Sequence, residues 1–254
     1  AAVALRASSQ LSAAERANEG PLHALTVKGG EDAPLLLIDQ REGGVAGLKE
    51  LTDFFRRAEI NFETRPLPTA DYLFVQRREG TEYVLPLLVE RKRCDDFGES
   101  IRDGRLDRQE RTMRAALGLL RGIAGSAFAA PRMLVLVEGR VLPQCRCGCT
   151  GTPGCVREGY ATHAVAKGLQ DRLKEMGVLQ VTDHLDGTSR FFLENYNALR
   201  ALLDERKAMG VRAYDLPTYA EFTTGLRRMR LTGSLPASTV GDWVQANPAA
   251  EPNE

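Results

Sequence analysis

The sequence predicts an α/β domain with a mixed central β-sheet flanked by helices. Apolar runs of strand length alternate along the chain with segments whose apolar residues recur at helical spacing. One pair of predicted strands is joined by a tight turn, which indicates an antiparallel hairpin within the sheet. The chain has 254 residues, of which 43% are hydrophobic and 27% charged, so it is long enough to bury a large core.

The first three predicted elements are a strand, a helix and a second strand. Residues 34–39, PLLLID, form an apolar run that ends in charge. The following segment carries apolar side chains at the spacing of an amphipathic helix, at Val45, Leu48, Leu51, Phe54 and Phe55. Residues 60–67, INFETRPL, then alternate like a strand.

Residues 71–92 predict a β-hairpin. Its two strands meet at Glu79, Gly80 and Thr81, which have the composition of a tight turn. Pro86 lies inside the second strand and cannot donate a hydrogen bond to a neighbouring strand. We therefore expect an edge position or a β-bulge at Pro86.

The second half of the predicted domain continues the alternation. Asp95 or Asp96 is expected to cap a short helix that Gly104 interrupts, and residues 105–122 predict a longer amphipathic helix. Residues 132–139 predict a buried strand. After a cysteine-rich insert we expect a helix, a strand and a helix at residues 160–176, 177–183 and 189–207.

We expect this domain to span residues 32–207, with the cysteine-rich insert at residues 143–157. Residues 1–31 lack sustained periodicity and are expected to be flexible. Residues 208–254 contain a basic helical stretch, TYAEFTTGLRRMRLTG, and then a tail rich in Pro, Ala and Asn that is expected to be flexible. The sequence has no run of 18 apolar residues and no secretory signal, which indicates a soluble intracellular protein without a membrane segment.

Charge is balanced over the whole chain and concentrated at one strand end. The 34 basic and 34 acidic residues give a formal net charge of zero, so a polyanionic partner has to be held by a local basic patch. The second hairpin strand passes from VLPLLV directly into ERKRCDD at residues 90–96. On an extended backbone Glu90 and Lys92 face the same way, whereas Arg91 faces the other.

A solvated ion pair between Glu90 and Lys92 would explain this pattern without any function. Asp71 adds a second observation, because it opens the partner strand, and antiparallel pairing brings the start of one strand near the end of the next. Two convergent carboxylates attract a hard cation such as Mg²⁺, and a neighbouring lysine adds positive charge beside a reacting phosphate. The arrangement therefore predicts a metal-dependent site for phosphodiester hydrolysis.

The same residues resemble the motif of the XPF family of structure-specific endonucleases, in which an aspartate precedes Glu-Arg-Lys, three residues and another aspartate. The motif here comprises Asp71, residues 90–92 and Asp96. The likeness extends through LLLIDQREGG and ESIRDGRLDRQERTM and covers roughly residues 35–205. The ERKR-DD and IRDGR stretches are most similar to the crossover-junction branch of the family.

The resemblance implies a restriction-endonuclease-like nuclease core with a metal site made of carboxylates. By matching position, the metal-site residues are Asp39, Asp71, Glu90 and Asp96, with Glu42 as a weaker member and with Arg91 and Lys92 in the catalytic motif. Arg41, Arg105 and Gln109 match positions near the DNA, although solvated surface charges explain the arginines equally well.

The implied activity is a Mg²⁺-dependent endonuclease, with Mn²⁺ as a substitute, that cuts flaps, forks and nicked junctions during DNA repair and recombination in the nucleus. The implied assembly is a dimer, either with a related subunit that has lost its motif or with a second copy of the chain. A helix with apolar residues at Phe192, Tyr196, Leu199 and Leu203 would bind that partner or would simply cover its own sheet.

Two features depart from the family pattern. Ala70 stands where the family usually has glycine before the first motif aspartate. No tandem helix-hairpin-helix module is recognisable after Lys207, where the family normally has one for binding the DNA backbone. Because the resembling family also contains them, a catalytically inactive scaffold subunit that binds branched DNA and a partner stays an alternative, although such subunits lose the carboxylates that this chain keeps.

The cysteine-rich insert raises a third hypothesis, a DNA-binding module organised by zinc. Four thiolates are enough for tetrahedral Zn²⁺, but two Cys-x-Cys steps followed by a gap of five residues match no common zinc ribbon. The sequence favours a flexible insert over a zinc site at Cys145, Cys147, Cys149 and Cys155.

Overall fold

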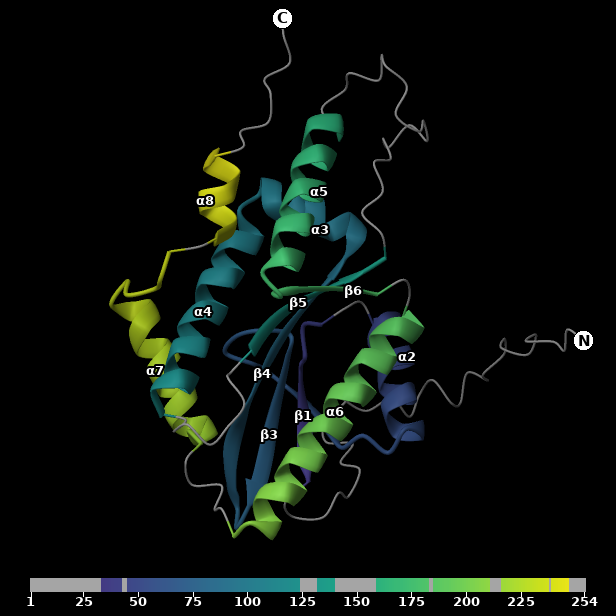
Figure 1. Cartoon of the computed structure of the whole chain (residues 1–254), viewed down its shortest axis with the longest axis vertical. Helices are drawn as coiled ribbons and strands as arrows, with labels where there is room; N and C mark the ends of the chain where they lie inside the picture. The colour runs from purple at the N-terminus through teal and green to yellow at the C-terminus, as the bar shows by residue number, and fades with distance from the viewer. Residues whose placement is uncertain are drawn as a thin grey trace, which may run out of the picture.

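The structure of the chain, a computed structural model, describes residues 33–42, 45–123, 132–139, 159–182, 185–210, 216–237 and 239–246. Within these residues, a six-stranded β-sheet carries helices on both faces (Figure 1). The N-terminal segment 1–31 and the last residues of the tail lie outside the described part, and so does the cysteine-rich insert.

The sheet is mixed, as the sequence predicts. Its strand order is β2-β1-β3-β4-β5-β6. β1 pairs with β3 and β3 with β4 in antiparallel fashion, whereas the β1–β2, β4–β5 and β5–β6 pairs are parallel. The strands are β1 (Pro34–Asp39), β2 (Phe62–Arg65), β3 (Tyr72–Arg78), β4 (Thr81–Arg93), β5 (Arg132–Glu138) and β6 (Leu179–Thr182).

The hairpin of β3 and β4 has the predicted turn and the predicted bulge. Glu79 and Gly80 both adopt positive φ angles, 49° and 75°, as a tight hairpin turn requires. Further along, a step of two residues in β3 from Leu73 to Val75 matches a step of four residues in β4. Pro86 lies in this irregular stretch, where its missing N–H breaks no regular ladder.

The described helices lie on both faces of the sheet (Figure 1). The first face carries α2 (Val45–Arg57) and α6 (Leu185–Ala208). The second face carries α3 (Cys94–Arg102), α4 (Arg105–Ile123), α5 (Gly159–Glu175), α7 (Tyr219–Leu231) and α8 (Thr239–Ala246).

The apolar residues of α6 cover the protein's own sheet. Phe192 is fully buried, and Tyr196, Leu199 and Leu203 are each at most 8% exposed within the core of this face. The rings of Phe192 and Tyr72 have centroids 4.4 Å apart. These four positions, which the sequence offered either to a partner or to the sheet, are therefore occupied by intramolecular packing.

The short helix α3 begins without an aspartate cap, so that prediction is wrong. Its N-cap residue is Arg93, which has extended backbone angles and makes no capping hydrogen bond through its side chain. The cause is the β4–β5 ladder, which continues to Arg93 paired with Glu138, so the chain passes directly from strand to helix. Asp96 thus lies in the first turn of α3, where the helix dipole favours negative charge.

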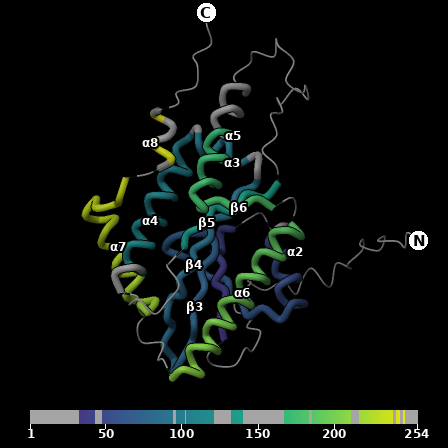
Figure 2. The backbone as a smooth tube through the Cα atoms, in the orientation of Figure 1, coloured from purple at the N-terminus to yellow at the C-terminus, as the bar shows by residue number. Residues whose placement is uncertain are grey.

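The segment after residue 207 packs onto the same sheet. Helix α7 begins with a capping box of Thr218 and Glu221, and its Phe222 and Leu226 are fully buried in the core between the sheet and α4. Figure 2 shows α7 lying along α4. In the part of the chain that the structure describes, no helix is both long and apolar enough to cross a membrane.

Candidate functional site

The ends of β1, β3 and β4 meet beside a cavity of about 570 Å³. The backbone fixes the meeting point: the Asp39 N–H donates to the Asp71 carbonyl at 2.8 Å, and the Asp71 N–H donates to the Val89 carbonyl at 3.0 Å. Hairpin pairing thereby brings Asp71 and Glu90 to one cavity, as the sequence predicts. The lining residues are Arg41, Pro68, Thr69, Ala70, Asp71, Glu90, Arg105, Arg108, Gln109, Thr112 and Arg230.

Three carboxylates form an acidic cluster at this point: those of the buried Glu42 and Glu90 and that of the half-buried Asp71. Burial raises the pKa of Glu42 to about 7, and the neighbouring charge of Asp71 contributes. Burial and the charge of Glu90 likewise raise the pKa of Asp71 to about 7. Such crowding of negative charge is relieved by protons or by a cation.

Glu90 and Lys92 form a buried ion pair on the cavity side of β4. Lys92 Nζ donates to Glu90 Oε1 at 2.7 Å, and both side chains are at most 6% exposed. Burial raises the pKa of Glu90 even though Lys92 acts in the opposite direction. The pair predicted from strand alternation is therefore present, and it adjoins the acidic cluster.

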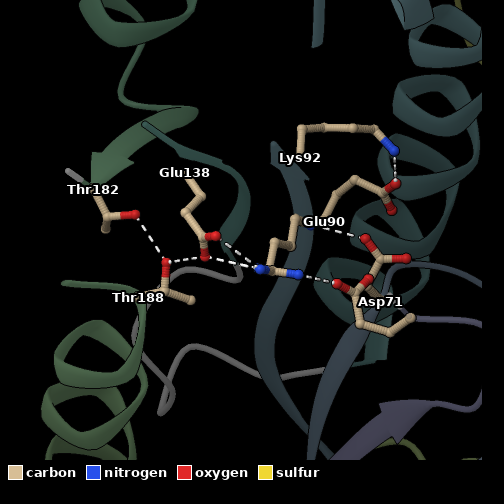
Figure 3. A network of polar contacts seen from close by, with 8 residues as sticks. Asp71, Glu90, Lys92, Glu138, Thr182 and Thr188 are labelled. Atoms are coloured by element: carbon tan, nitrogen blue, oxygen red, sulfur yellow. Dashed lines mark hydrogen bonds and ion pairs between the residues drawn. The ribbon is translucent and has the colours of Figure 1, made fainter. Parts of the chain in front are cut away.

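Arg91 contacts two members of the cluster, one through its backbone and one through its side chain, which lies on the other face of β4. Its backbone N–H donates to Asp71 Oδ2 at 2.8 Å, and its Nη1 donates to Glu42 Oε1 at 2.7 Å. Figure 3 shows Asp71 and Glu90 on one side of this network and Glu138 on the other. The central residue of the Glu-Arg-Lys motif therefore orients carboxylates.

Asp39 is held by its neighbour Arg41. The carboxylate accepts from the Arg41 backbone N–H at 2.8 Å, from Arg41 Nε at 2.9 Å and Nη2 at 2.7 Å, and from the Leu67 N–H at 3.0 Å. Burial acts to raise the pKa of Asp39, but these hydrogen bonds outweigh it and leave the pKa below its ordinary value. Asp39 adjoins the cavity through Arg41, whose side chain is 74% exposed.

Asp96 lies outside the set of residues that line the cavity. Its Oδ1 accepts from Arg105 Nη2 at 2.8 Å, and Arg105 also pairs with Asp103 at 3.2 Å. The structure thus brings Asp71 and Glu90 together with Glu42, and it pairs the other two predicted metal carboxylates with arginines.

A basic rim surrounds the acidic centre of the cavity. Arg41, Arg105 and Gln109 belong to the lining, as the sequence suggests, and the Gln109 Oε1 atom is buried without a hydrogen-bond partner in the structure. Sequence reasoning missed Arg108 and Arg230. Arg108 lies three residues after Arg105 on α4, a helical spacing that indicates a shared face.

Arg230 could not have been found from local spacing. It lies in the last turn of α7, and its Nη2 donates to the Pro68 carbonyl at 2.5 Å, which places it beside the loop that precedes Asp71. No periodicity connects residue 230 with residue 71. Its position depends on the packing of α7 against the sheet.

Ala70 sits in the left-handed region of backbone space, with a φ of 59°. This conformation explains why a glycine suits the position before the first motif aspartate, since a side chain there costs free energy. Ala70 is the smallest side chain that incurs the cost, and it is only 8% exposed. The turn that delivers Asp71 to the cavity is therefore retained.

The donor chemistry of the cluster fits a hard cation. Carboxylate oxygens of Asp71, Glu90 and Glu42 are the ligand type that Mg²⁺ and Mn²⁺ prefer, and the surrounding cavity leaves room for water. No preformed group of three or more metal-binding side chains occurs among the described residues, so an ion would draw these carboxylates inward. The four cysteines of the insert lie outside the described residues.

Comparisons with known proteins identify one matching family model and two partial relatives. The family model described as the ERCC4 domain matches residues 38–147. A crossover junction endonuclease MUS81 from Candida albicans is 46% identical over 57 residues, which are 22% of this chain and 9% of the relative. The MUS81 from Debaryomyces hansenii is 31% identical over 108 residues, which are 40% of this chain and 16% of the relative. The chain thus spans only a small part of the curated relatives that it matches.

Two solved structures with some similarity are of XPF from Aeropyrum pernix. The first has a TM-score of 0.37 and 23% identity, with 68% of this chain and 69% of that chain covered. The second, a complex with DNA, has a TM-score of 0.38 and 21% identity, with 86% of this chain and 92% of that chain covered.

Proposed function

We propose that the chain is a structure-specific endonuclease of the XPF family that hydrolyses phosphodiester bonds in branched DNA. The ERCC4 match over residues 38–147 and the partial similarity to MUS81 endonucleases support this proposal. The observation that carries the proposal is an acidic centre inside a basic rim: Asp71 and Glu90 face the same cavity as four arginines. Carboxylates repel phosphates, so a surface that only binds DNA is weakened by them. A cation between carboxylates and phosphate resolves this conflict.

We assign the cation to Asp71 and Glu90, with Glu42 beside them, and expect Mg²⁺ with Mn²⁺ as a substitute. When bound, such an ion supplies positive charge against the reacting phosphate. Lys92, which contacts Glu90 at 2.7 Å, orients that carboxylate and adds a second positive charge near the reacting group.

The arginines of the rim bind the phosphates on either side of the cut. Arg108 and Arg230 face the cavity from α4 and α7. Arg41 and Arg105 hold Asp39 and Asp96, respectively, through hydrogen bonds of 2.7 and 2.8 Å. When these two arginines turn to phosphates, the two aspartates become available to the cation, which links DNA binding to metal binding.

We further propose that the chain acts in DNA repair and recombination in the nucleus, together with a related subunit that lacks the motif. The charge distribution supports the need for a partner, because a net charge of zero leaves only the local rim to hold DNA. A partner would use a surface other than Phe192, Tyr196, Leu199 and Leu203, which pack into the protein's own core.

The test is cleavage of labelled flap, fork and nicked-junction DNA, by the chain alone and after co-expression with a motif-lacking homologue, with Mg²⁺ or with chelator. The variant Asp71→Asn with Glu90→Gln should bind the same DNA but lose cleavage, because it removes two ligand charges with little change in volume. Glu194→Gln is the matched control, since Glu194 is exposed on α6 outside the cavity.

Three outcomes count against the proposal. Cleavage that continues in chelator would contradict the dependence on a metal ion. Wild-type nicking by the double variant would contradict the assignment of the site to Asp71 and Glu90. Binding of branched DNA without cleavage under any condition would instead identify the inactive scaffold subunit. A chain that is active as a homodimer would refute only the need for a different partner.

A further inference from the structure

The guanidinium of Arg91 is divided between two carboxylates. Nη1 donates to Glu42 Oε1 at 2.7 Å, whereas Nε and Nη2 donate to Glu138 Oε2 at 3.1 and 2.9 Å. The Arg91 side chain is only 9% exposed, so water competes little for these hydrogen bonds. A planar guanidinium that is held along one edge cannot turn, and Glu138 therefore sets the direction of Nη1.

Glu138 is itself fixed by two buried hydroxyl groups. Thr188 Oγ1 donates to Glu138 Oε2 at 2.8 Å, and the hydroxyl oxygens of Thr182 and Thr188 are 2.9 Å apart. A hydroxyl has a single hydrogen, so Thr188, which donates to Glu138, accepts from Thr182. Figure 3 shows this line of contacts from Thr182 through Thr188 and Glu138 toward Asp71.

The first turn of α6 lies close enough to β6 for these contacts because of Gly187. A Cβ atom at Gly187 would lie 3.1 Å from the Thr182 Cβ, which is closer than ordinary van der Waals contact. The absence of a side chain at residue 187 therefore lets Thr188 reach both Thr182 and Glu138. The N-terminal turn of α6 also favours the negative charge of Glu138.

From these contacts we propose that Glu138, anchored by Thr188 and Thr182, is a positioning residue that aims Arg91 at Glu42. Glu138 does not line the cavity and lies on the strand next to β4, so it acts through Arg91 and not on DNA. Its charge has a second effect. Arg91 carries one positive charge, and without Glu138 that charge would be drawn wholly to the acidic cluster, where it would compete with the cation.

This inference rests on the proposed nuclease activity, so its test includes a measurement that needs no cleavage. Glu138→Gln keeps the shape and one acceptor oxygen but removes the charge, and Thr188→Val keeps the shape but removes the hydroxyl. Gly187→Ala displaces the first turn of α6 without touching Arg91 or Glu138. All three are compared with the wild type for single-turnover cleavage, for DNA binding and for Mn²⁺ binding by electron paramagnetic resonance.

The expected result for Glu138→Gln is a cleavage rate and a Mn²⁺ affinity that each fall about 10- to 100-fold. The DNA dissociation constant should stay within about twofold of the wild type, because Glu138 is behind the site. Thr188→Val and Gly187→Ala should show smaller losses of the same kind.

Glu82→Gln is the matched control for loss of a half-buried charge that pairs with arginine. Glu82 also accepts from two arginines, Arg65 at 2.6 Å and Arg77 at 2.5 Å, and its side chain is 15% exposed compared with 16% for Glu138. It lies at the opposite end of β4 and should lower thermal stability by a similar amount without affecting Mn²⁺ binding.

Two results would overturn the inference: wild-type Mn²⁺ affinity in Glu138→Gln, or equal losses of Mn²⁺ affinity in Glu138→Gln and Glu82→Gln. If the wild type binds Mn²⁺ but cuts no DNA, the proposed function fails while the Mn²⁺ measurement still decides the role of Glu138. If Glu138→Gln does not fold, the same two results are read from Thr188→Val.

Discussion

Replacing Glu42 by glutamine removes one charge from the acidic cluster and keeps an oxygen that can accept from Arg91 Nη1. In the folded protein, burial and the charge of Asp71 raise the pKa of Glu42 to about 7 from an ordinary value of 4.5. At a pH between these two pKa values, Glu42 keeps its proton in the folded protein but has released it in the unfolded chain. Stability from this group is therefore fully present below pH 4.5 and is lost as the pH rises through 7.

The size of this effect follows from the two pKa values. The difference between about 7 and 4.5 corresponds to about 3 kcal/mol of unfolding free energy, because one pH unit is about 1.4 kcal/mol. Glutamine has no proton to lose at this position. We expect the unfolding free energy of Glu42→Gln, relative to the wild type, to increase by about 3 kcal/mol between acidic and alkaline pH.

Urea unfolding in chelator at pH 4 and at pH 8, followed by circular dichroism, measures this difference. Glu50→Gln is the control, because Glu50 is exposed on α2, and its difference from the wild type should be the same at both pH values. A Glu42→Gln difference that does not change with pH would refute the description of the cluster. When Mg²⁺ replaces the chelator at pH 8, the wild type should gain more stability than Glu42→Gln.

Three further predictions concern the cavity and the insert. Lys92→Ala should lower the single-turnover cleavage rate about 100-fold with little change in DNA affinity, because the charge of Lys92 acts in the transition state. A loss confined to DNA affinity would instead identify Lys92 as a phosphate contact. Arg230→Gln should weaken DNA binding and reduce the slope of log K against log salt by about 0.9. Arg228→Gln, on the same helix but outside the cavity lining, should change this slope less, and equal changes in the two variants would contradict the proposed role of Arg230. Replacing all four cysteines of the insert by serine, at Cys145, Cys147, Cys149 and Cys155, should leave Mg²⁺-dependent cleavage unchanged. Loss of folding in this variant, together with stoichiometric zinc in the wild type, would contradict this prediction.

The elements of the fold could be predicted because each has a strong local pattern. The apolar run of residues 34–39 has the same bounds as β1, and the Glu79–Gly80 turn lies where hairpin chemistry placed it. Element boundaries that depend on neighbouring strands could not be predicted from local sequence. The start of α3 is one example, since it follows from the pairing of Arg93 with Glu138, and that pairing is set by the strand order and not by local sequence.

The residues of the candidate site likewise include some that local sequence predicts and some that it does not. Asp71 and Glu90 are neighbours through a hairpin, so the distance between them follows from antiparallel pairing alone. Glu138 and Arg230 reach the site through a parallel strand and a helix that lie far away in the sequence. The motif could indicate the chemistry, but the residues that support it depend on tertiary packing.

The three motif residues of β4 act on different parts of the site because the strand is pleated. Glu90 lines the cavity and pairs with Lys92 on the same face of the strand, and the side chain of Arg91 projects to the opposite face, where it joins Glu42 to Glu138. The backbone N–H of Arg91 binds Asp71 from between them. A shift of one residue in the pairing of β4 would exchange the two faces and bury the guanidinium against α4. The bulge at Pro86 and the ladder to β5 therefore determine the register on which the order Glu-Arg-Lys depends.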